Sequence, residues 1–188
     1  MKSLFLVMLG AALPVALAAQ APAGACTHRG SEADLARRPS PLDSVQAAIG
    51  GATVKVCYGR PSARGRTMLG GHEPFGKAWR LGANEPTRIT LPFDAEVAGV
   101  RVPAGTYSLY VVLQPSSWEV HVNRDVSRWG IPIDSAVEAQ DVGKGTVPVE
   151  TLAQPVEQLT MRIVTDPSAA LVVEWEKTRV TIPIRKAS

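Results

Sequence analysis

Arginine is concentrated in one short stretch of the sequence, directly after a segment that has the pattern of a buried strand. The stretch VCYGRPSARGR contains Arg60, Arg64 and Arg66. Guanidinium groups bind carboxylate, phosphate and sulfate in a bidentate geometry, so this composition favours recognition of an anionic or polar ligand. Two later segments, residues 77–87 and 175–179, combine further cations with tryptophan and glutamate.

We expect these three segments to meet in one cluster. The aromatic rings would form its walls, and Glu85, Glu174 or Glu176 would neutralise some of its arginines. Two interpretations of such a cluster remain open: an internal ion-pair network that fixes strand register, and a cleft that binds a ligand. The candidate ligand-binding residues are Tyr58, Arg60, Ser62, Arg64, Arg66, Lys77, Trp79, Arg80, Asn84, Glu85, Trp175, Lys177 and Arg179.

Catalysis has weaker support in the sequence than binding does. Glu174 and Glu176 lie two residues apart on an expected strand, hence about 7 Å apart on one face, a separation that glycoside hydrolases use. A solvated sheet face produces the same spacing, and this is the favoured interpretation. Glu85 is a third candidate acid. The chain has no Gly-x-Ser-x-Gly motif, and Ser62 suits a turn better than a nucleophile.

Metal, cofactor and nucleic-acid binding are not expected. His28, His72 and His121 are isolated in the sequence and are predicted to be surface histidines, with no Cys-x-x-Cys or acidic loop beside them. The formal net charge of +3 is too small to indicate a nucleic-acid partner.

The elements that must position these residues are strands. Apolar residues alternate with polar ones in TRITLPF, TYSLYVVLQ, WEVHVNR, EQLTMRIV, LVVEWE and VTIPI. Two more strands flank Gly50-Gly51, a signal for a tight hairpin turn. The segment VETLAQP is expected to form one helical turn. The sequence therefore predicts an all-β, single-domain antiparallel β-sandwich, jelly-roll-like, over residues 43–186.

Strict alternation creates a conflict at two of the cationic segments. It would point Arg60 into the interior that Val54 and Val56 occupy, and would do the same to Lys177 and Arg179 after Trp175. An unpaired guanidinium is too costly to bury. Each strand is therefore expected to end, to bulge, or to supply an acidic partner.

The N-terminal region indicates export. Residues 1–19 have the basic start, apolar centre and small residues of a signal peptide, and residues 20–42 lack periodicity and are expected to be a flexible arm. Cys26 and Cys57 are the two cysteines of the chain. They are expected to form a disulfide in the periplasm or outside the cell, while lipid anchoring through Cys26 is the less favoured alternative.

Six segments of the sequence together resemble those of a known family. They are YGRPSARGRTMLGG, PFGKAWRLGANEPTRIT, VPAGTYSLYVV, WEVHVNRD, the WG at 129–130, and LVVEWEKTRVTIPI. In this order, over roughly residues 41–185, they resemble the bacterial family called domain of unknown function 2911 (DUF2911). The resemblance implies an exported, single-domain β-protein and implies no activity.

These observations favour a non-catalytic role: binding of a polar or anionic small molecule or a glycan at the cluster. The alternatives are a hydrolase that acts on cell-envelope carbohydrate, and a structural envelope protein without a ligand. No second apolar segment is long enough to cross a bilayer.

Overall fold

The computed structural model describes residues 24–187, so the expected signal peptide lies outside the described residues. Within them no helix has the length and apolar character that a membrane span requires. Two short helices and ten strands make up the regular structure: α1 (Glu32–Ala36), β1 (Leu42–Ile49), β2 (Ala52–Gly59), β3 (Ala78–Trp79), β4 (Thr87–Leu91), β5 (Ala95–Val97), β6 (Val100–Val102), β7 (Gly105–Leu113), β8 (Ser117–Asn123), α2 (Ser135–Glu138), β9 (Asp141–Val164) and β10 (Ala170–Lys186).

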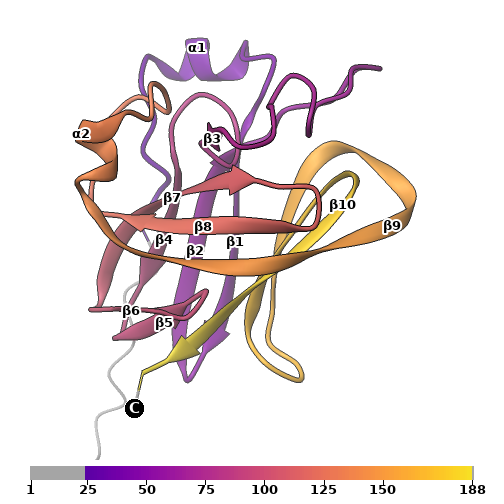
Figure 1. Cartoon of the computed structure of the whole chain (residues 1–188). Coiled ribbons are helices and arrows are strands. Elements are labelled where there is room, and N and C mark those ends of the chain that lie inside the picture. The colour runs from indigo at the N-terminus through magenta and orange to yellow at the C-terminus, as the bar shows by residue number, and fades with distance from the viewer. Residues whose placement is uncertain (1–23, 188) are drawn as a thin grey trace, which may run out of the picture.

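The strands form one continuous antiparallel network in the order β1-β2-β4-β7-β8-β9-β10-β5-β6, with β3 paired to β7. The prediction of an all-β antiparallel fold is confirmed. β9 and β10 are long enough to bend, and in Figure 1 β8 and the first part of β9 cross in front of β1 and β2. The sheet therefore folds over itself and packs its inner faces on one apolar core.

Alternation decides which residues enter this core. Val54, Val56 and Tyr58 of β2 are buried, while the residues between them are partly exposed. Gly50 and Gly51 connect β1 to β2 with φ values of 58° and 83°, the left-handed backbone that a two-residue hairpin turn requires. The hairpin expected at this position is present.

The segment after β2 joins two distant parts of the sheet. Ser62 forms an isolated antiparallel bridge with Gln158 of β9. The amide of Ala63 donates to the Glu157 carbonyl at 2.9 Å, and the amide of Leu159 donates to the Pro61 carbonyl at 2.9 Å. Since Pro61 has no N–H, it contributes its carbonyl alone to this pairing. Regular pairing of β2 therefore ends at Gly59, before the arginines begin.

A bulge resolves the conflict in β10. The β9–β10 register shifts on both sides of Glu176, whose φ is 51°. The residues that enter the apolar core before the bulge are Leu171, Val173 and Trp175, and those after it are Val180, Ile182 and Ile184. The inward face thus changes from odd to even positions, and Lys177 becomes exposed.

β9 corrects one expectation. VETLAQP, residues 149–155, is strand and not a helical turn. Pro155 lies where the pairing jumps from Val156 with Glu176 to Thr151 with Thr178, so its missing N–H removes no ladder bond. Tertiary pairing with β10 has overridden the local helix signal.

Residues 24–41 of the expected arm lie against the domain. A disulfide joins Cys26 to Cys57 of β2, as predicted. Ser31 and Asp34 cap α1 reciprocally: the Ser31 hydroxyl accepts from the Asp34 amide, and the Asp34 carboxylate accepts from the Ser31 amide. The amide of Arg60 donates to the Pro41 carbonyl at 2.8 Å, which fixes the end of the arm beside β2.

Candidate functional site

Two loops, 59–66 and 80–85, touch through their backbones and form the base of the candidate site. The Ala83 amide donates to the Gly59 carbonyl at 3.2 Å. A Cβ on Gly59 would lie 1.9 Å from the Ala83 carbonyl oxygen, so this crossing admits no side chain. Gly82 is also close, because its Cβ would lie 2.9 Å from the Gly59 carbonyl oxygen. The glycines therefore bring Arg64, Arg66 and Arg80 to one region.

A cavity of about 270 Å³ opens between these loops, and we call it the arginine pocket. The end of the arm, the turn at 68–73 and the start of the β10 bulge complete its wall. Its lining consists of Pro39, Ser40, Pro61, Ser62, Arg64, Arg66, Met68, His72, Glu73, Arg80, Gly82, Ala83 and Trp175.

The three arginines of the pocket donate to backbone carbonyls. Arg64 Nη2 donates to Pro39 O at 3.2 Å, and Arg66 Nε donates to Ala63 O at 2.9 Å. Arg80 Nε donates to Gly82 O at 3.3 Å. Within residues 24–187, none of the three guanidinium groups has a carboxylate oxygen within 4.0 Å. Their positive charge is therefore not cancelled by a direct ion pair.

Glu73 is the carboxylate of the pocket lining. Burial raises the pKa of Glu73, and the charges of Arg80 and His72 partly offset this rise. Burial lowers the pKa of Arg80, and attraction to Glu73 partly restores it. Both groups therefore lack full hydration, and a bound anion would compensate the desolvation of Arg80.

The remaining predicted cations lie elsewhere. Arg60 donates through Nε to Leu159 O at 3.0 Å and lies 3.5 Å from Asp43. Arg179 donates to Glu174 at 2.6 Å, a pairing that we expected. Arg162 donates to the same carboxylate at 2.6 Å, and these hydrogen bonds lower the pKa of Glu174. The expectation that Glu174 is a solvated surface residue is wrong, since it is buried.

The other two candidate glutamates also have fixed partners. Glu176 accepts hydrogen bonds from the amides of Met68 and Leu69 at 2.9 and 2.8 Å, and so holds the turn that lines the pocket. Glu85 is buried and pairs with Arg38 of the arm at 2.7 Å. It does not pair with Arg60, Arg80 or Arg179, because Arg38 and the Arg29 amide of the arm occupy its carboxylate oxygens.

One of the predicted aromatic walls reaches the pocket. Trp175 lines it, while its Nε1 donates to Glu157 O at 3.1 Å. Trp79 is buried and stacks on Trp175 with ring centroids 5.6 Å apart. Tyr58 is a core residue whose hydroxyl accepts from the Met161 amide at 3.1 Å. Lys77 and Lys177 are exposed and do not line the pocket.

The pocket thus unites five of the predicted residues with several that the sequence did not indicate. The five are Ser62, Arg64, Arg66, Arg80 and Trp175. Asn84 lies outside it, and its amide donates to Ser40 O at 3.0 Å, which positions the arm. Ser40 was missed because nothing in an aperiodic arm indicates where it lies. Glu73 was missed because the strand pattern does not extend to its turn.

One histidine corrects the sequence analysis. His121 was expected on the surface, but it is buried in a polar network. Its ring nitrogens contact Asp141 at 2.7 Å and Glu119 at 2.9 Å, and Tyr110 donates to Asp141 at 2.6 Å. Burial, together with the bond to Asp141, raises the pKa of Tyr110. No group of three or more potential metal ligands with suitable geometry occurs among the described residues.

A family model described as "Protein of unknown function (DUF2911)" matches residues 40–184. No curated protein and no solved structure matches the chain significantly.

Proposed function

Since the chain belongs to the DUF2911 family, whose function is unknown, we propose from its site that it is a non-catalytic binding protein for a small anionic molecule. The ligand would present a carboxylate, phosphate or sulfate group to the arginine pocket. The observation that carries this proposal is that three guanidinium groups line one cavity without a direct carboxylate partner. Guanidinium groups bind such anions by paired, charge-assisted hydrogen bonds.

Two further observations support binding at this place. The arginines come from two loops that a close glycine crossing joins, and the Glu176 carboxylate holds the neighbouring turn of the pocket. This arrangement gives the pre-organisation that anion recognition requires. The glutamates considered for hydrolysis all accept hydrogen bonds from arginines or backbone amides. The disulfide is compatible with an exported protein, which would bind its ligand in the periplasm or outside the cell.

Substitution of the pocket arginines tests this proposal. We expect sulfate or phosphate to bind the wild-type protein. Arg80→Met and Arg64→Met should each weaken that binding by about tenfold or more, because each removes a charge-assisted hydrogen bond. Isothermal titration at constant ionic strength measures the affinity. Arg185→Met is the matched control, because Arg185 is 69% exposed and its ion pair with Glu96 is at 3.9 Å.

The control variant must bind as tightly as the wild type. Circular dichroism of each variant separates lost binding from lost folding. Equal affinities in the wild type, Arg64→Met and Arg80→Met would contradict the proposal, as would the absence of any heat or thermal shift with sulfate, phosphate, acetate and citrate.

The pH dependence of sulfate binding gives a second test. The raised pKa of Glu73 means that its negative charge is lost at a higher pH than for an ordinary glutamate. Since sulfate keeps its charge over this range, its affinity is expected to increase as the pH falls through that pKa. His72 also lines the pocket, and its charge attracts the Glu73 carboxylate.

Glu73→Gln isolates the contribution of Glu73. We expect tighter sulfate binding at neutral pH in this variant, because a negative charge has been removed beside Arg64, Arg66 and Arg80. Its affinity should then vary less with pH than that of the wild type. A variant whose affinity and pH profile match the wild type would show that Glu73 does not face the ligand.

A further inference from the structure

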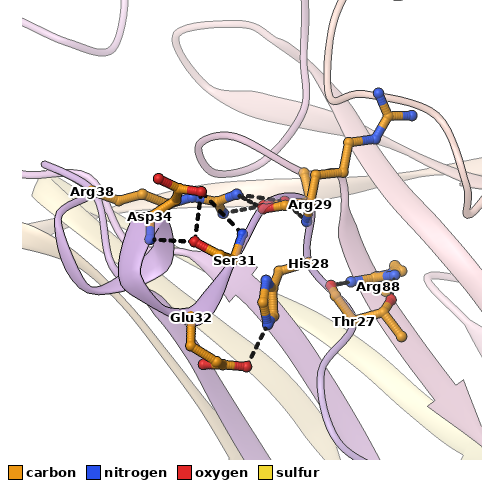
Figure 2. Close-up of polar contacts among 9 residues, drawn as sticks. Thr27, His28, Arg29, Ser31, Glu32, Asp34, Arg38 and Arg88 are labelled. Atoms are coloured by element: carbon orange, nitrogen blue, oxygen red, sulfur yellow. Dashed lines mark hydrogen bonds and ion pairs between the residues drawn. The ribbon is translucent and has the colours of Figure 1, made fainter.

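A second cavity lies beneath the N-terminal arm, and we call it the arm cavity. Its volume is about 150 Å³, and it shares no lining residue with the arginine pocket. Figure 2 shows the arm above β4, with Arg88 bonded to Thr27 and His28 bonded to Glu32. The lining consists of Thr27, His28, Arg29, Glu85, Arg88, Val126, Ser127 and Arg128.

Unpartnered polar atoms gather around this cavity. Five buried side-chain nitrogen or oxygen atoms in the described part of the chain have no hydrogen-bond partner, and three of them belong to cavity-lining residues: His28 Nδ1, Arg128 Nε and Arg128 Nη2. A fourth is the hydroxyl of Ser108, which lies directly opposite Arg88 in the β4–β7 ladder. Because buried polar groups almost always have partners, this concentration of unpartnered donors favours a binding site for a solvent molecule or an ion.

The charge of the lining favours an anion. Arg29 Nη2 donates to Ser127 O, Arg88 donates to Thr27, and Arg128 Nη1 donates to Gly130 O. Within residues 24–187 these three guanidinium groups have no carboxylate oxygen within 4.0 Å. The acid of the lining, Glu85, is already neutralised by Arg38. Burial lowers the pKa of Arg88 and of Arg128, so both groups have lost part of their hydration.

We propose that the arm cavity is a second binding site, and that it holds one small inorganic anion such as chloride. A water molecule occupies about 30 Å³, so the cavity has room for one such ion and a few waters. Water alone would satisfy the unpartnered donors but would bring no counter-charge into contact with the guanidinium groups, since Glu85 attracts Arg88 and Asp125 attracts Arg128 without a direct ion pair. The bound ion would join the arm, β4 and the loop at 126–128.

Anomalous diffraction from wild-type crystals soaked in sodium bromide tests this site, because bromide replaces chloride and scatters anomalously. We expect a bromide peak within hydrogen-bonding distance of Arg128 Nε or Nη2. A water peak at that position without anomalous signal would overturn the proposal. So would a bromide peak in the arginine pocket with none in the arm cavity.

Chloride-35 NMR tests the same site in solution, where bound chloride broadens the resonance. Arg128→Met should reduce the affinity derived from this broadening by about tenfold or more. Arg128→Lys, which keeps the charge and loses the fork of donors, should reduce it less. Arg185→Met, at an exposed position outside both sites, should leave it unchanged. Equal broadening in the wild type and both Arg128 variants would contradict the site, and loss in Arg64→Met alone would assign chloride to the arginine pocket.

Discussion

Removal of the Cys26–Cys57 disulfide is expected to lower the free energy of unfolding by about 3–4 kcal/mol. The two cysteines are 31 residues apart, and closing a loop of this length removes that much conformational entropy from the unfolded chain in the chain-entropy model. The bond also fixes the arm, which supplies Pro39 and Ser40 to the arginine pocket. Urea denaturation of the oxidised protein and of the Cys26→Ser/Cys57→Ser variant measures the difference.

An exposed hydrogen bond of the arm provides the control for this experiment. Lys55 Nζ donates to Gly24 O at 2.9 Å, an exposed contact beside the disulfide. Lys55→Met is expected to change the free energy of unfolding by less than about 1 kcal/mol. The oxidised wild type in reductant should shift toward the midpoint of the double serine variant. Equal midpoints for the oxidised and the disulfide-free protein would show that the arm is held by its polar contacts alone.

The sequence predicts the strands well because each strand buries one face. The alternation in β2, β4, β7 and β8 follows directly from the geometry of a half-buried strand, in which successive side chains point to opposite sides. Gly50-Gly51 adds a local turn signal. Alternation and turn signals are both contained within a few consecutive residues, so they predict a strand even when the strands it pairs with are not known.

The sequence predicts that β10 must deviate from regularity but does not say how. Alternation shows that Trp175 and Lys177 cannot both point inward, and the deviation is a bulge at Glu176. The bulge depends on a distant turn, because Glu176 accepts hydrogen bonds from Met68 and Leu69. A partner more than a hundred residues away leaves no local signal. For the same reason the helical signal of VETLAQP was misleading.

The candidate site was predicted in part. An unpaired arginine cannot remain in the apolar core, so the sequence predicts that the strand ends before its arginines. β2 does end at Gly59, before Arg64 and Arg66. Their convergence with Arg80 depends on the backbone crossing at Gly59 and Ala83, which the glycines alone do not specify. The arm was the largest omission. It contributes Pro39 and Ser40 to the pocket, and its contacts with Arg64, Asn84 and Glu85 join residues 25 to 47 positions apart.

Replacement of Glu85 is expected to be among the most destabilising single substitutions in the chain. The Glu85 side chain is 6% exposed and that of Arg38 is 13% exposed, and the two are joined by hydrogen bonds of 2.7 and 3.0 Å. Glu85 also accepts from the Arg29 amide at 2.7 Å. Glu85→Gln keeps the shape of the side chain and leaves the Arg38 charge buried without its partner, at a cost of about 3 kcal/mol.

A double-mutant cycle identifies the cause of this loss. Arg38→Met removes the charged partner of Glu85 and should be similarly destabilising, whereas Glu85→Gln/Arg38→Met should cost clearly less than the sum of the single substitutions. Glu96→Gln is the matched control, because its pair with Arg185 is exposed, and it should cost less than about 1 kcal/mol. Additive effects of the two single substitutions in urea denaturation would show that Glu85 and Arg38 act independently.

Acid sensitivity should report the same ion pair. Burial alone would raise the pKa of Glu85, but hydrogen bonds from Arg38 and from the Arg29 amide outweigh it and lower the pKa in the folded protein. A carboxyl group whose pKa is lowered by folding contributes stability that is complete above its pKa in the unfolded chain. That contribution is lost as the pH falls through the lowered folded value. The wild type should therefore lose more stability than Glu85→Gln between neutral pH and about pH 3, which lies below the ordinary glutamate pKa of about 4.3. Urea denaturation across this range measures the loss for each protein. Equal losses of stability would show that the acid sensitivity comes from other carboxylates. Glu174 would be the first of these to test, because Arg162 and Arg179 lower its pKa in the same way.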